Sequence, residues 1–274
     1  MGWTQVCYCY DGSFAGFLCC IYQSYVYHEI PACFSTPDTP QMSLWPSREV
    51  ETDRTQAERV YHSLAEKISP GVQALVKRGF LTCLDQRELH LWRLIRRGYR
   101  QGARVLGDLT ADEVCTLRRA VQHLEHEAHL LKGFVRFSDL EGILVAQISP
   151  KNQVLPLLRT HFCSRYPGEP FVIYDRTHRQ VLFHRQGEWS IVPVADFQVG
   201  APGEEERVWR GLWRRFYDTI AIEGRYNPKC RMTQMPKRYW ENMTEFQTDP
   251  AGPARPAGEA QPPSCVRTHK KPAG

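Results

Sequence analysis

Residues 6–29 read VCYCYDGSFAGFLCCIYQSYVYHE, and this stretch predicts a strand, a tight turn and a helix in direct succession. Val6–Tyr10 has the apolar and aromatic composition of a short buried strand. Asp11 and Gly12 are turn residues, and the Ser13 hydroxyl can accept a hydrogen bond from the first turn of a helix. We therefore expect a strand over 6–10 and a helix over Phe14–Glu29.

Downstream of that helix, the sequence predicts a loop, a second strand and a second helix. The loop is marked by four prolines: Pro31, Pro37, Pro40 and Pro46. Glu49–Asp53 then predicts a strand, after which Asp53 or Thr55 can cap a helix. The apolar residues of that helix recur at helical spacing: Ala57, Val60, Tyr61, Leu64 and Ile68. A strand, a helix and a strand in this order indicate a βαβ-like unit at the N-terminus.

The rest of the chain changes from helical to strand periodicity. Helices are expected to about residue 131. Five strands follow, with a hairpin turn at Gln186-Gly187: Phe134–Phe137, Gly142–Ile148, Pro170–Tyr174, Gln180–His184 and Trp189–Val192. A helix over Asn152–Cys163 interrupts them. A final helix over Glu204–Ile222 is expected to bury one apolar side: Trp209, Leu212, Trp213, Phe216 and Ile220. The predicted class is α+β, with a βαβ-like segment and helices, then a largely antiparallel sheet with flanking helices.

Three parts are predicted along the 274 residues. Residues 1–84 form an N-terminal α/β segment, and residues 85–247 form the main α+β domain. Residues 248–274 hold many prolines, few apolar residues and a basic end, which is typical of a disordered tail.

The cysteines and apolar segments indicate a reducing, cytoplasmic location. The ten cysteines include no C-x-x-C pair, and Cys7-x-Cys9 in a strand makes no zinc ligand set. We therefore expect reduced cysteines. The apolar run Phe14–Tyr27 follows an aspartate rather than a basic segment and is too short to span a bilayer, so no membrane segment is predicted.

Positive charge is concentrated in two segments. Residues 207–238 carry nine basic and two acidic side chains, and residues 87–104 carry six arginines and one glutamate. In residues 87–104, five arginines at helical spacing can line one flank of a helix: Arg93, Arg96, Arg97, Arg100 and Arg104. Such a row suits phosphate contacts, because each guanidinium presents a bidentate fork to anionic oxygens. The alternative is an ordinary exposed helix face that pairs with acidic neighbours.

The end of the basic segment 207–238 places two cations next to two aromatic residues. Lys237 and Arg238 precede Tyr239 and Trp240, a pattern that can neutralise a phosphate backbone and stack on exposed bases. The alternative is that both aromatic residues pack into the core, and for Trp240 this is the preferred interpretation.

Candidate catalytic residues are few, and no known catalytic motif accompanies them. The sequence has no phosphate-binding loop, no dinucleotide-binding glycine motif and no nucleophile elbow. His123, His126 and His129 are three apart, whereas a metalloprotease helix needs histidines four apart, so a solvated face is preferred over a metal site. No metal or cofactor is predicted. The weak candidates for catalysis are Asp11, Asp53, Glu127, His129 and Asp175, of which the first two are as easily turn and cap residues.

Several stretches together resemble a bacterial family of DNA metabolism or DNA repair proteins whose core is a domain of unknown function. In the first half these are Tyr10–Phe14, Glu51–Asp53, Ala57–Val60, Glu127–His129 and Gly133–Phe137. In the second half they are Asn152, Val154–Leu157, Phe162, Arg165-Tyr166, Ile173–Asp175, Met235–Trp240 and Thr244–Phe246. The resemblance runs from about Val6 to Phe246.

The resemblance implies a role in DNA repair or modification with a partner enzyme. Members of that family are encoded beside a radical-SAM iron–sulfur protein with a helix-hairpin-helix-like DNA-binding region, and a similar domain is fused to uracil-DNA-glycosylase-like domains. We therefore expect a DNA-binding accessory protein. The expected nucleic-acid contacts are Arg93, Arg96, Arg97, Arg100, Arg136, Arg214, Arg215, Lys237 and Arg238. A metal-dependent enzyme acting directly on DNA and a protein-only scaffold remain alternatives.

Overall fold

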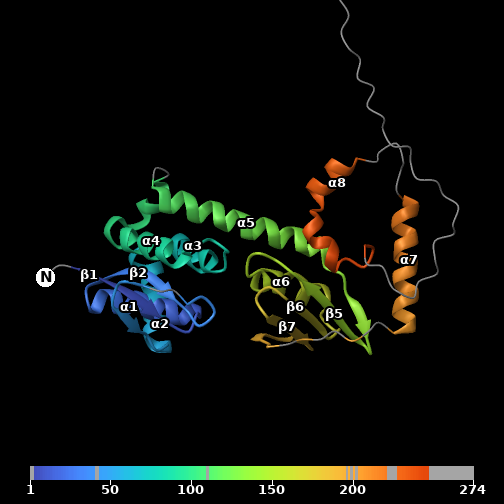
Figure 1. Cartoon of the computed structure of the whole chain (residues 1–274), viewed down its shortest axis with the longest axis horizontal. Helices are drawn as coiled ribbons and strands as arrows, with labels where there is room; N and C mark the ends of the chain where they lie inside the picture. The colour runs from blue at the N-terminus through green and yellow to red at the C-terminus, as the bar shows by residue number, and fades with distance from the viewer. Residues whose placement is uncertain are drawn as a thin grey trace, which may run out of the picture.

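One long helix, α5 (Asp112–Phe134), joins two groups of helices and strands, as Figure 1 shows. In this computed structural model, the described residues are 3–40, 43–108, 111–195, 197, 200, 203–220 and 227–246, without the side chains of 217, 218 and 220. The predicted tail 248–274 and the end of the predicted final helix at 221–222 lie outside these residues. The predicted α+β class is confirmed.

The N-terminal group is built on a three-stranded parallel sheet. β1 (Thr4–Cys9) lies between β2 (Glu29–Ser35) and β3 (Ser47–Glu49), and α1 (Phe14–Val26) connects β1 to β2. The Ser13 hydroxyl caps α1 by accepting a hydrogen bond of 2.9 Å from the N–H of Gly16. The N-terminal βαβ-like unit is therefore present as predicted.

Two boundaries in this sheet differ from the prediction. α1 ends at Val26 rather than Glu29, because His28 adopts a left-handed φ of 57° and turns the chain into β2. β2 lies where four prolines predicted a loop. Pro31 is accommodated because β2 is an edge strand, which has one side free of ladder hydrogen bonds. β3 also begins and ends earlier than the predicted strand.

A disulfide joins β1 to β2. Cys7 and Cys33 are register partners on the two strands, with their Cα atoms 4.8 Å apart, and their sulfurs are bonded. The expectation of reduced cysteines is wrong for this pair, because the prediction placed Cys33 in a loop. Outside this pair, the described cysteines that are free are Cys9, Cys19, Cys20, Cys83, Cys163 and Cys230.

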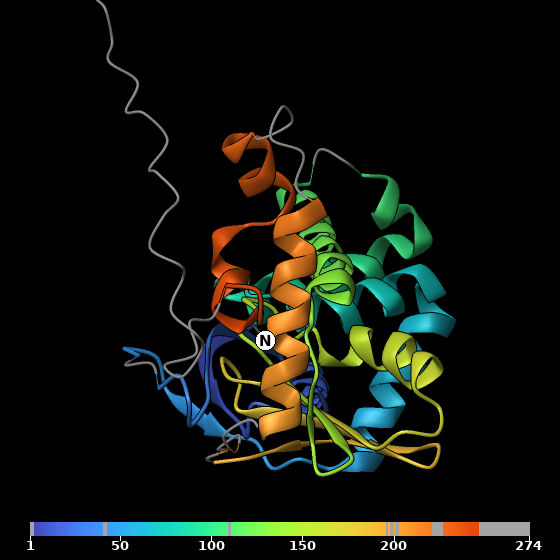
Figure 2. The same cartoon turned by 90° about the vertical axis from the view of Figure 1, so that its right-hand side faces the viewer.

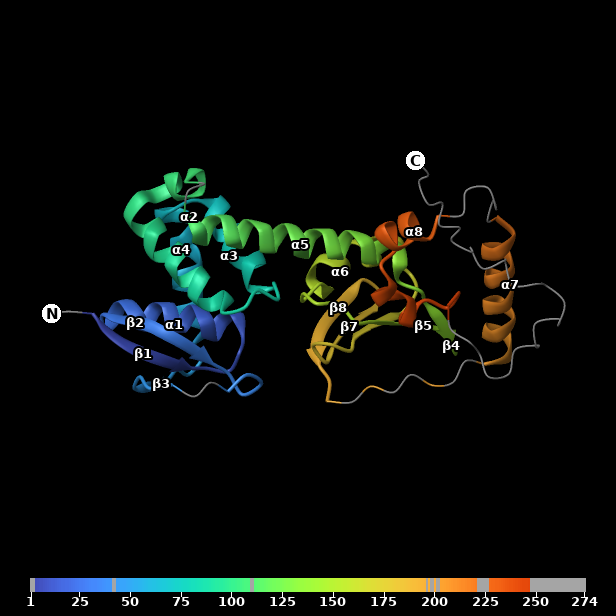
Figure 3. The same ribbon diagram turned by 45° about the horizontal axis from the view of Figure 1, so that its top comes forward.

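Helices complete the N-terminal group. α2 (Arg54–Lys67) begins at its cap Asp53, and α3 (Pro70–Phe80), α4 (Arg87–Gln101) and the 3-10 helix η1 (Gly102–Gly107) follow. Figure 3 shows α3 and α4 beside the first half of α5, and α2 packs against α1 and α3. The indole of Trp92 in α4 donates a hydrogen bond of 3.1 Å to the Ser24 hydroxyl in α1. Among the described helices, none is long and apolar enough to cross a membrane.

The C-terminal group contains a five-stranded sheet in the order β4-β5-β6-β7-β8. Its strands are β4 (Ser138–Leu140), β5 (Ile143–Ile148), β6 (Phe171–Asp175), β7 (Gln180–Arg185) and β8 (Glu188–Pro193). β5 and β6 are parallel and connected through α6 (Leu155–Arg165), and the other neighbours are antiparallel. Gln186 and Gly187 both have positive φ, 51° and 84°, as a two-residue hairpin turn requires.

One predicted strand of this group is wrong. Residues 134–137 contain no strand: α5 continues through Phe134, and β4 begins only at Ser138. Phe134 and Phe137 pack against the second hydrophobic core, and Phe137 contacts Phe171 edge-on with ring centroids 6.0 Å apart. Three apolar residues and one arginine therefore mark a helix end and a packed connection rather than a strand.

The chain ends in α7 (Glu204–Ile220), α8 (Pro228–Gln234) and the 3-10 helix η3 (Lys237–Asn242). The prediction that α7 buries its apolar side is wrong. Trp209 is 62% exposed and Phe216 is 56% exposed, and Leu212 and Trp213 are exposed as well. Figure 2 shows α7 on the outside of the molecule, facing the viewer. The helix contacts the protein through its polar side and through Trp213, which lies beside Arg136, so most of the apolar side is exposed.

Two hydrophobic cores lie on either side of the middle of α5. The first extends from Val6 to Leu117 and the second from Leu124 to Met243. α5 contributes to both, with Leu117 in the first and Leu124 in the second. This helix therefore supports the surfaces of both groups.

Candidate nucleic-acid interface

Four of the predicted arginines gather on the exposed side of α4. The opposite side of this helix is apolar, and Leu91, Leu94 and Ile95 are completely buried in the first core. This burial fixes the rotation of α4 about its axis and turns the arginines outward. They line a shallow surface hollow of about 530 Å³ beside Trp92 and Glu113: Arg93, Arg96, Arg97 and Arg100. We call these four residues the α4 arginine face.

Arg96 lies against two aromatic rings. Its guanidinium carbon is 4.4 Å from the centroid of the Trp3 ring and 5.0 Å from that of Trp92. Cation–π contacts of this kind hold a guanidinium in place without neutralising its charge. Trp3 lies far away in the sequence, so the spacing of the arginines could not reveal this contact.

The four arginines differ in their acidic partners. Arg97 pairs with Asp108 and, at 3.2 Å, with Glu113, so its charge is largely compensated. Arg93 and Arg100 are exposed, and within the described ranges neither has a carboxylate at ion-pair distance. Burial, followed by the charge of Arg93, lowers the pKa of the neighbouring His90. The α4 arginine face therefore presents uncompensated positive charge at both of its ends.

The predicted C-terminal cations are mostly engaged within the protein. Arg136 makes a bidentate ion pair with Glu245, at 2.8 and 3.2 Å, and the Arg214 guanidinium donates to the carbonyl of Thr244 at 3.2 Å. Arg215 and Lys237 are exposed. Arg104, in η1, is exposed but does not line the hollow. These cations do not gather in one place as those of α4 do.

The aromatic residues beside Lys237 pack against the protein. Tyr239 is buried in the second core. The Trp240 ring stacks on Phe246 with centroids 4.6 Å apart, and its indole N–H donates to the carbonyl of Met235 at 3.0 Å. Packing, rather than base stacking, accounts for both rings.

Asp11 and Asp53, two of the candidates for catalysis, lie close together through Thr52. The Asp11 carboxylate accepts hydrogen bonds from the Thr52 hydroxyl at 2.8 Å and from the N–H of Ser13 at 2.9 Å. Burial alone would raise the pKa of Asp11, but these hydrogen bonds outweigh it and lower the pKa. Asp53 accepts hydrogen bonds from two N–H groups of the first turn of α2, at 2.7 and 3.0 Å. Both carboxylates thus serve as turn and cap.

Gly16 faces this turn and leaves no room for a side chain. A Cβ atom there would lie 2.7 Å from the Thr52 hydroxyl and closer still to the Asp11 carboxylate. We expect Gly16→Ala to lower the free energy of unfolding by about 1–3 kcal/mol, measured by chemical denaturation. Gly133→Ala is the control, because nothing lies within 4 Å of that position and alanine is the better helix former. Equal stability of Gly16→Ala and the wild type would contradict the close packing of this turn.

Glu127, the third candidate, is a buried structural acceptor. Its carboxylate is 2% exposed and accepts hydrogen bonds from Asn152, at 2.8 Å from the backbone N–H and 2.6 Å from the side-chain amide. The N–H of Lys151 donates to it at 3.1 Å, the Arg238 guanidinium lies 3.2 Å away, and the Tyr239 hydroxyl donates at 3.4 Å. This carboxylate ties α5 to the segment after β5 and to η3.

Asp175 and His129 lie in other places. Asp175 is fully buried at the end of β6, where it accepts hydrogen bonds from the N–H groups of Thr177 and His178 and pairs with the His178 ring at 2.6 Å. This contact shapes the turn into β7. His129 is exposed on α5, as are His123 and His126. Within the described part of the chain, no group of three or more potential ligand residues could hold a metal ion.

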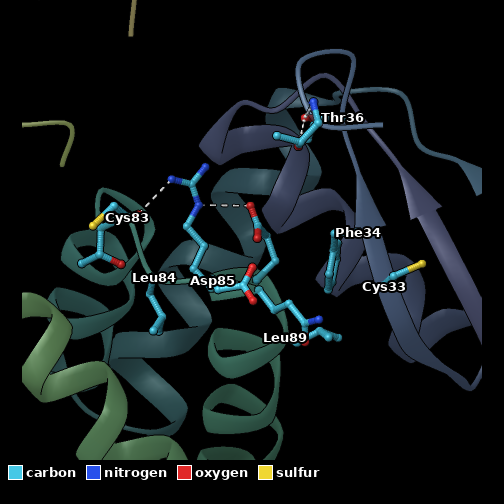
Figure 4. A pocket seen from close by; sticks show the side chains of 12 residues that line it. Cys33, Phe34, Thr36, Cys83, Leu84, Asp85 and Leu89 are labelled. Atoms are coloured by element: carbon cyan, nitrogen blue, oxygen red, sulfur yellow. Dashed lines mark hydrogen bonds and ion pairs between the residues drawn. The ribbon is translucent and has the colours of Figure 1, made fainter. Parts of the chain in front are cut away.

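A second hollow, of about 350 Å³, lies beside the carboxyl end of β2 and was not predicted (Figure 4). Phe34 and Thr36 border it on one side, and the segment leading into α4 borders it on the other. There the Arg87 guanidinium pairs with Glu88 at 3.1 Å, and Glu88 accepts a hydrogen bond of 3.0 Å from the Tyr10 hydroxyl. Burial and the Glu88 carboxylate raise the pKa of Tyr10. The charges of Arg87 and Glu88 compensate each other, and Asp85 adds a further carboxylate to the lining of the hollow.

The sequence contained little signal for this second hollow. The carboxyl ends of parallel strands are a common place for ligands in α/β sheets. However, β2 was not predicted, so its carboxyl end could not be placed beside residues 82–89.

Comparison with known proteins identifies the family of the chain. The model of a family described as a domain of unknown function, DUF4130, matches residues 85–245. No curated protein and no solved structure matches the chain. The matched segment contains the α4 arginine face, the long helix α5 and the five-stranded sheet. Because the match covers more than half of the chain, the protein belongs to the DUF4130 family of domains of unknown function.

Proposed function

We propose that the protein binds DNA through the α4 arginine face and acts as an accessory to a radical-SAM enzyme that repairs or modifies DNA. The observation that carries the DNA-binding part is the pair of uncompensated cations, Arg93 and Arg100, on either side of an Arg96 guanidinium held over two tryptophan rings. Cationic surface of this kind attracts polyanions and releases their counterions on contact.

The spacing of these cations suits a nucleic-acid backbone. Arg93 and Arg100 are seven residues apart, so they lie about two helical turns, or about 10 Å, apart along the axis of α4. Along one strand of duplex DNA this length corresponds to about three nucleotides. Both cations can therefore contact phosphates of one strand, with Arg96 between them.

An accessory role is better supported than direct catalysis on DNA. Of the five candidates for catalysis, Asp11 and Asp53 cap a turn and a helix, Glu127 holds the segment after β5, and Asp175 holds the turn into β7. Each of these four carboxylates already accepts hydrogen bonds from its own chain, and only Asp11 and Asp53 lie near each other. The partner enzyme is proposed from the resemblance to bacterial DNA repair proteins alone.

Binding of fluorescently labelled single-stranded, duplex and uracil-containing DNA, followed by anisotropy at low salt, tests the DNA-binding proposal. We expect Arg93→Ala/Arg100→Ala to raise Kd at least about tenfold, because two phosphate contacts are lost. The matched control is Arg165→Ala/Arg179→Ala, which removes two exposed arginines from the other group of elements.

The outcomes separate three roles. A specific loss in the α4 variant, with control binding intact, supports the proposal, provided both variants melt like the wild type. Equal losses in the two variants would assign binding to overall charge rather than to α4. Absence of binding to every DNA would favour a protein-only scaffold, and cleavage of the DNA in the presence of Mg²⁺ would favour an enzyme.

The accessory part of the proposal is tested with the radical-SAM protein itself. We expect the two proteins to co-elute, and we expect retention of the enzyme on DNA to require Arg93 and Arg100. Retention that is the same with and without this chain would contradict the accessory role.

A further inference from the structure

α7 exposes a continuous apolar surface. Five large side chains on this helix are 39–62% exposed: Val208, Trp209, Leu212, Trp213 and Phe216. At 100° per residue, Val208, Leu212 and Phe216 fall on one side of the helix, with Trp209 beside them. A contiguous apolar surface on a water-soluble helix marks a contact with another molecule more often than an accident of folding.

The orientation of α7 is fixed by polar contacts on its other side. The Glu206 carboxylate accepts hydrogen bonds from Arg210 at 2.8 Å and from the N–H of Asp139 at 3.2 Å. Arg210 also donates to the Ser138 hydroxyl, and Arg214 donates to the carbonyl of Thr244. Residues 206, 210 and 214 lie opposite Leu212 on the helix. These contacts leave Val208, Leu212 and Phe216 on the side turned away from β4 and Thr244, exposed among the described residues.

The charges along α7 match those of the same helix running in the opposite direction. Its first turn is acidic, with Glu204, Glu205 and Glu206, and no acidic residue follows until Asp218. The middle and later part is basic, with Arg207, Arg210, Arg214 and Arg215. Of these residues, Glu205 and Arg215 lie on the apolar side. A parallel pair of α7 helices would place like charges together there, whereas an antiparallel pair places Glu205 of each helix against Arg215 of the other.

We propose that α7 forms an antiparallel pair with α7 of a second copy of this chain, making a two-fold symmetric dimer. With the two-fold axis beside residue 210, Glu205 of each copy lies opposite Arg215 of the other, and Val208 lies opposite Leu212. Both Glu205 and Arg215 are exposed in the single chain. A two-fold interface is self-complementary, and the reversed charge order of α7 meets that condition. The second copy thus accounts for both the exposed apolar side of α7 and the order of its charges.

Sedimentation velocity and light scattering on the full chain, without DNA, over a concentration series test the dimer. We expect a mass of twice the 31.7 kDa of the chain at the higher concentrations. Leu212→Glu, a change at a position already 48% exposed, is expected to raise the dimer Kd at least about thirtyfold without altering the far-UV circular dichroism. A chain that is monomeric throughout, or a dimer unaffected by Leu212→Glu, would overturn the proposal and leave α7 to a different partner.

A charge-exchange experiment tests the antiparallel arrangement. Glu205→Arg and Arg215→Glu are each expected to weaken the dimer, because each places like charges opposite one another. The double variant Glu205→Arg/Arg215→Glu is expected to restore it, since the opposite-charge pairs are re-formed in reverse. Additive weakening in the double variant would overturn the antiparallel pairing.

Discussion

Replacing Glu127 with alanine is expected to lower the free energy of unfolding by about 3–5 kcal/mol. The carboxylate accepts two hydrogen bonds from Asn152, which is itself 4% exposed, and one from the N–H of Lys151. Without it, these donors are buried with no acceptor, and Arg238 loses its anionic partner. Denaturant titration followed by circular dichroism measures the loss.

His126→Ala is the matched control for this variant, because His126 is exposed on the same helix one residue away. We expect its stability to stay within about 0.5 kcal/mol of the wild type. Glu127→Gln, which keeps one acceptor oxygen but removes the charge, is expected to fall between the two. Glu127→Ala as stable as the wild type would show that Glu127 is not a structural acceptor and would revive its candidacy for catalysis.

Arg136→Ala is expected to lower the free energy of unfolding by about 2–4 kcal/mol and to leave DNA affinity unchanged. The side chain of Glu245 is 1% exposed, and its two oxygens accept the bidentate hydrogen bonds of Arg136. Loss of the guanidinium leaves this carboxylate buried and unpaired. The same side chain also lies over the Trp213 ring, at 5.6 Å, and so supports the inner edge of α7.

The control for Arg136→Ala is Arg185→Ala, which removes an equal charge from an exposed position at the end of β7. Denaturant titration is expected to show little change for this control. Anisotropy with labelled DNA, at a temperature where both variants are folded, measures the second part of the prediction. A folded Arg136→Ala with weakened DNA binding would place Arg136 in the interface, as the resemblance to the DNA repair family suggested.

The parts of the fold that local chemistry determines were predictable from the sequence. Ser13 and Asp53 cap their helices as their residue types indicate, and the Gln186-Gly187 turn joins β7 to β8. β2 was missed because prolines predict loops, whereas an edge strand tolerates Pro31. Periodicity in α7 correctly indicated one apolar side but could not show whether that side faces the core or solvent. The contacts of the polar side with the rest of the protein determine this orientation.

The candidate site was predictable in part for a similar reason. Helical spacing identified the arginines of α4, since Arg93 and Arg100 recur on one side of the helix. The spacing could not show which arginines are neutralised by a carboxylate. Arg97 pairs with Asp108 and Glu113, and Arg96 lies over Trp3, and only folding brings these residues together. Most candidates for catalysis were chosen because they are acidic residues at the predicted end of a helix or strand. Acidic residues at such positions are equally typical of caps and turns.

The segment matched by the family model depends on the residues before it. α4 belongs to residues 85–245, yet its apolar side packs into the core built with residues 6–80, and its Arg96 contacts Trp3. The α4 arginine face is therefore oriented by a part of the chain outside the match. Removal of the first 84 residues is expected to expose Leu91, Leu94 and Ile95 and to disorganise this face.

The salt dependence of DNA affinity tests DNA binding by the α4 arginine face most directly. Each phosphate contact that is lost reduces the slope of log affinity against log salt concentration by about 0.9 for duplex DNA. We therefore expect Arg93→Ala/Arg100→Ala to give a slope shallower than that of the wild type by about 2, with the Arg165→Ala/Arg179→Ala control unchanged. Identical slopes for the wild type and Arg93→Ala/Arg100→Ala, or no binding by the wild type even at low salt, would contradict DNA contact through α4.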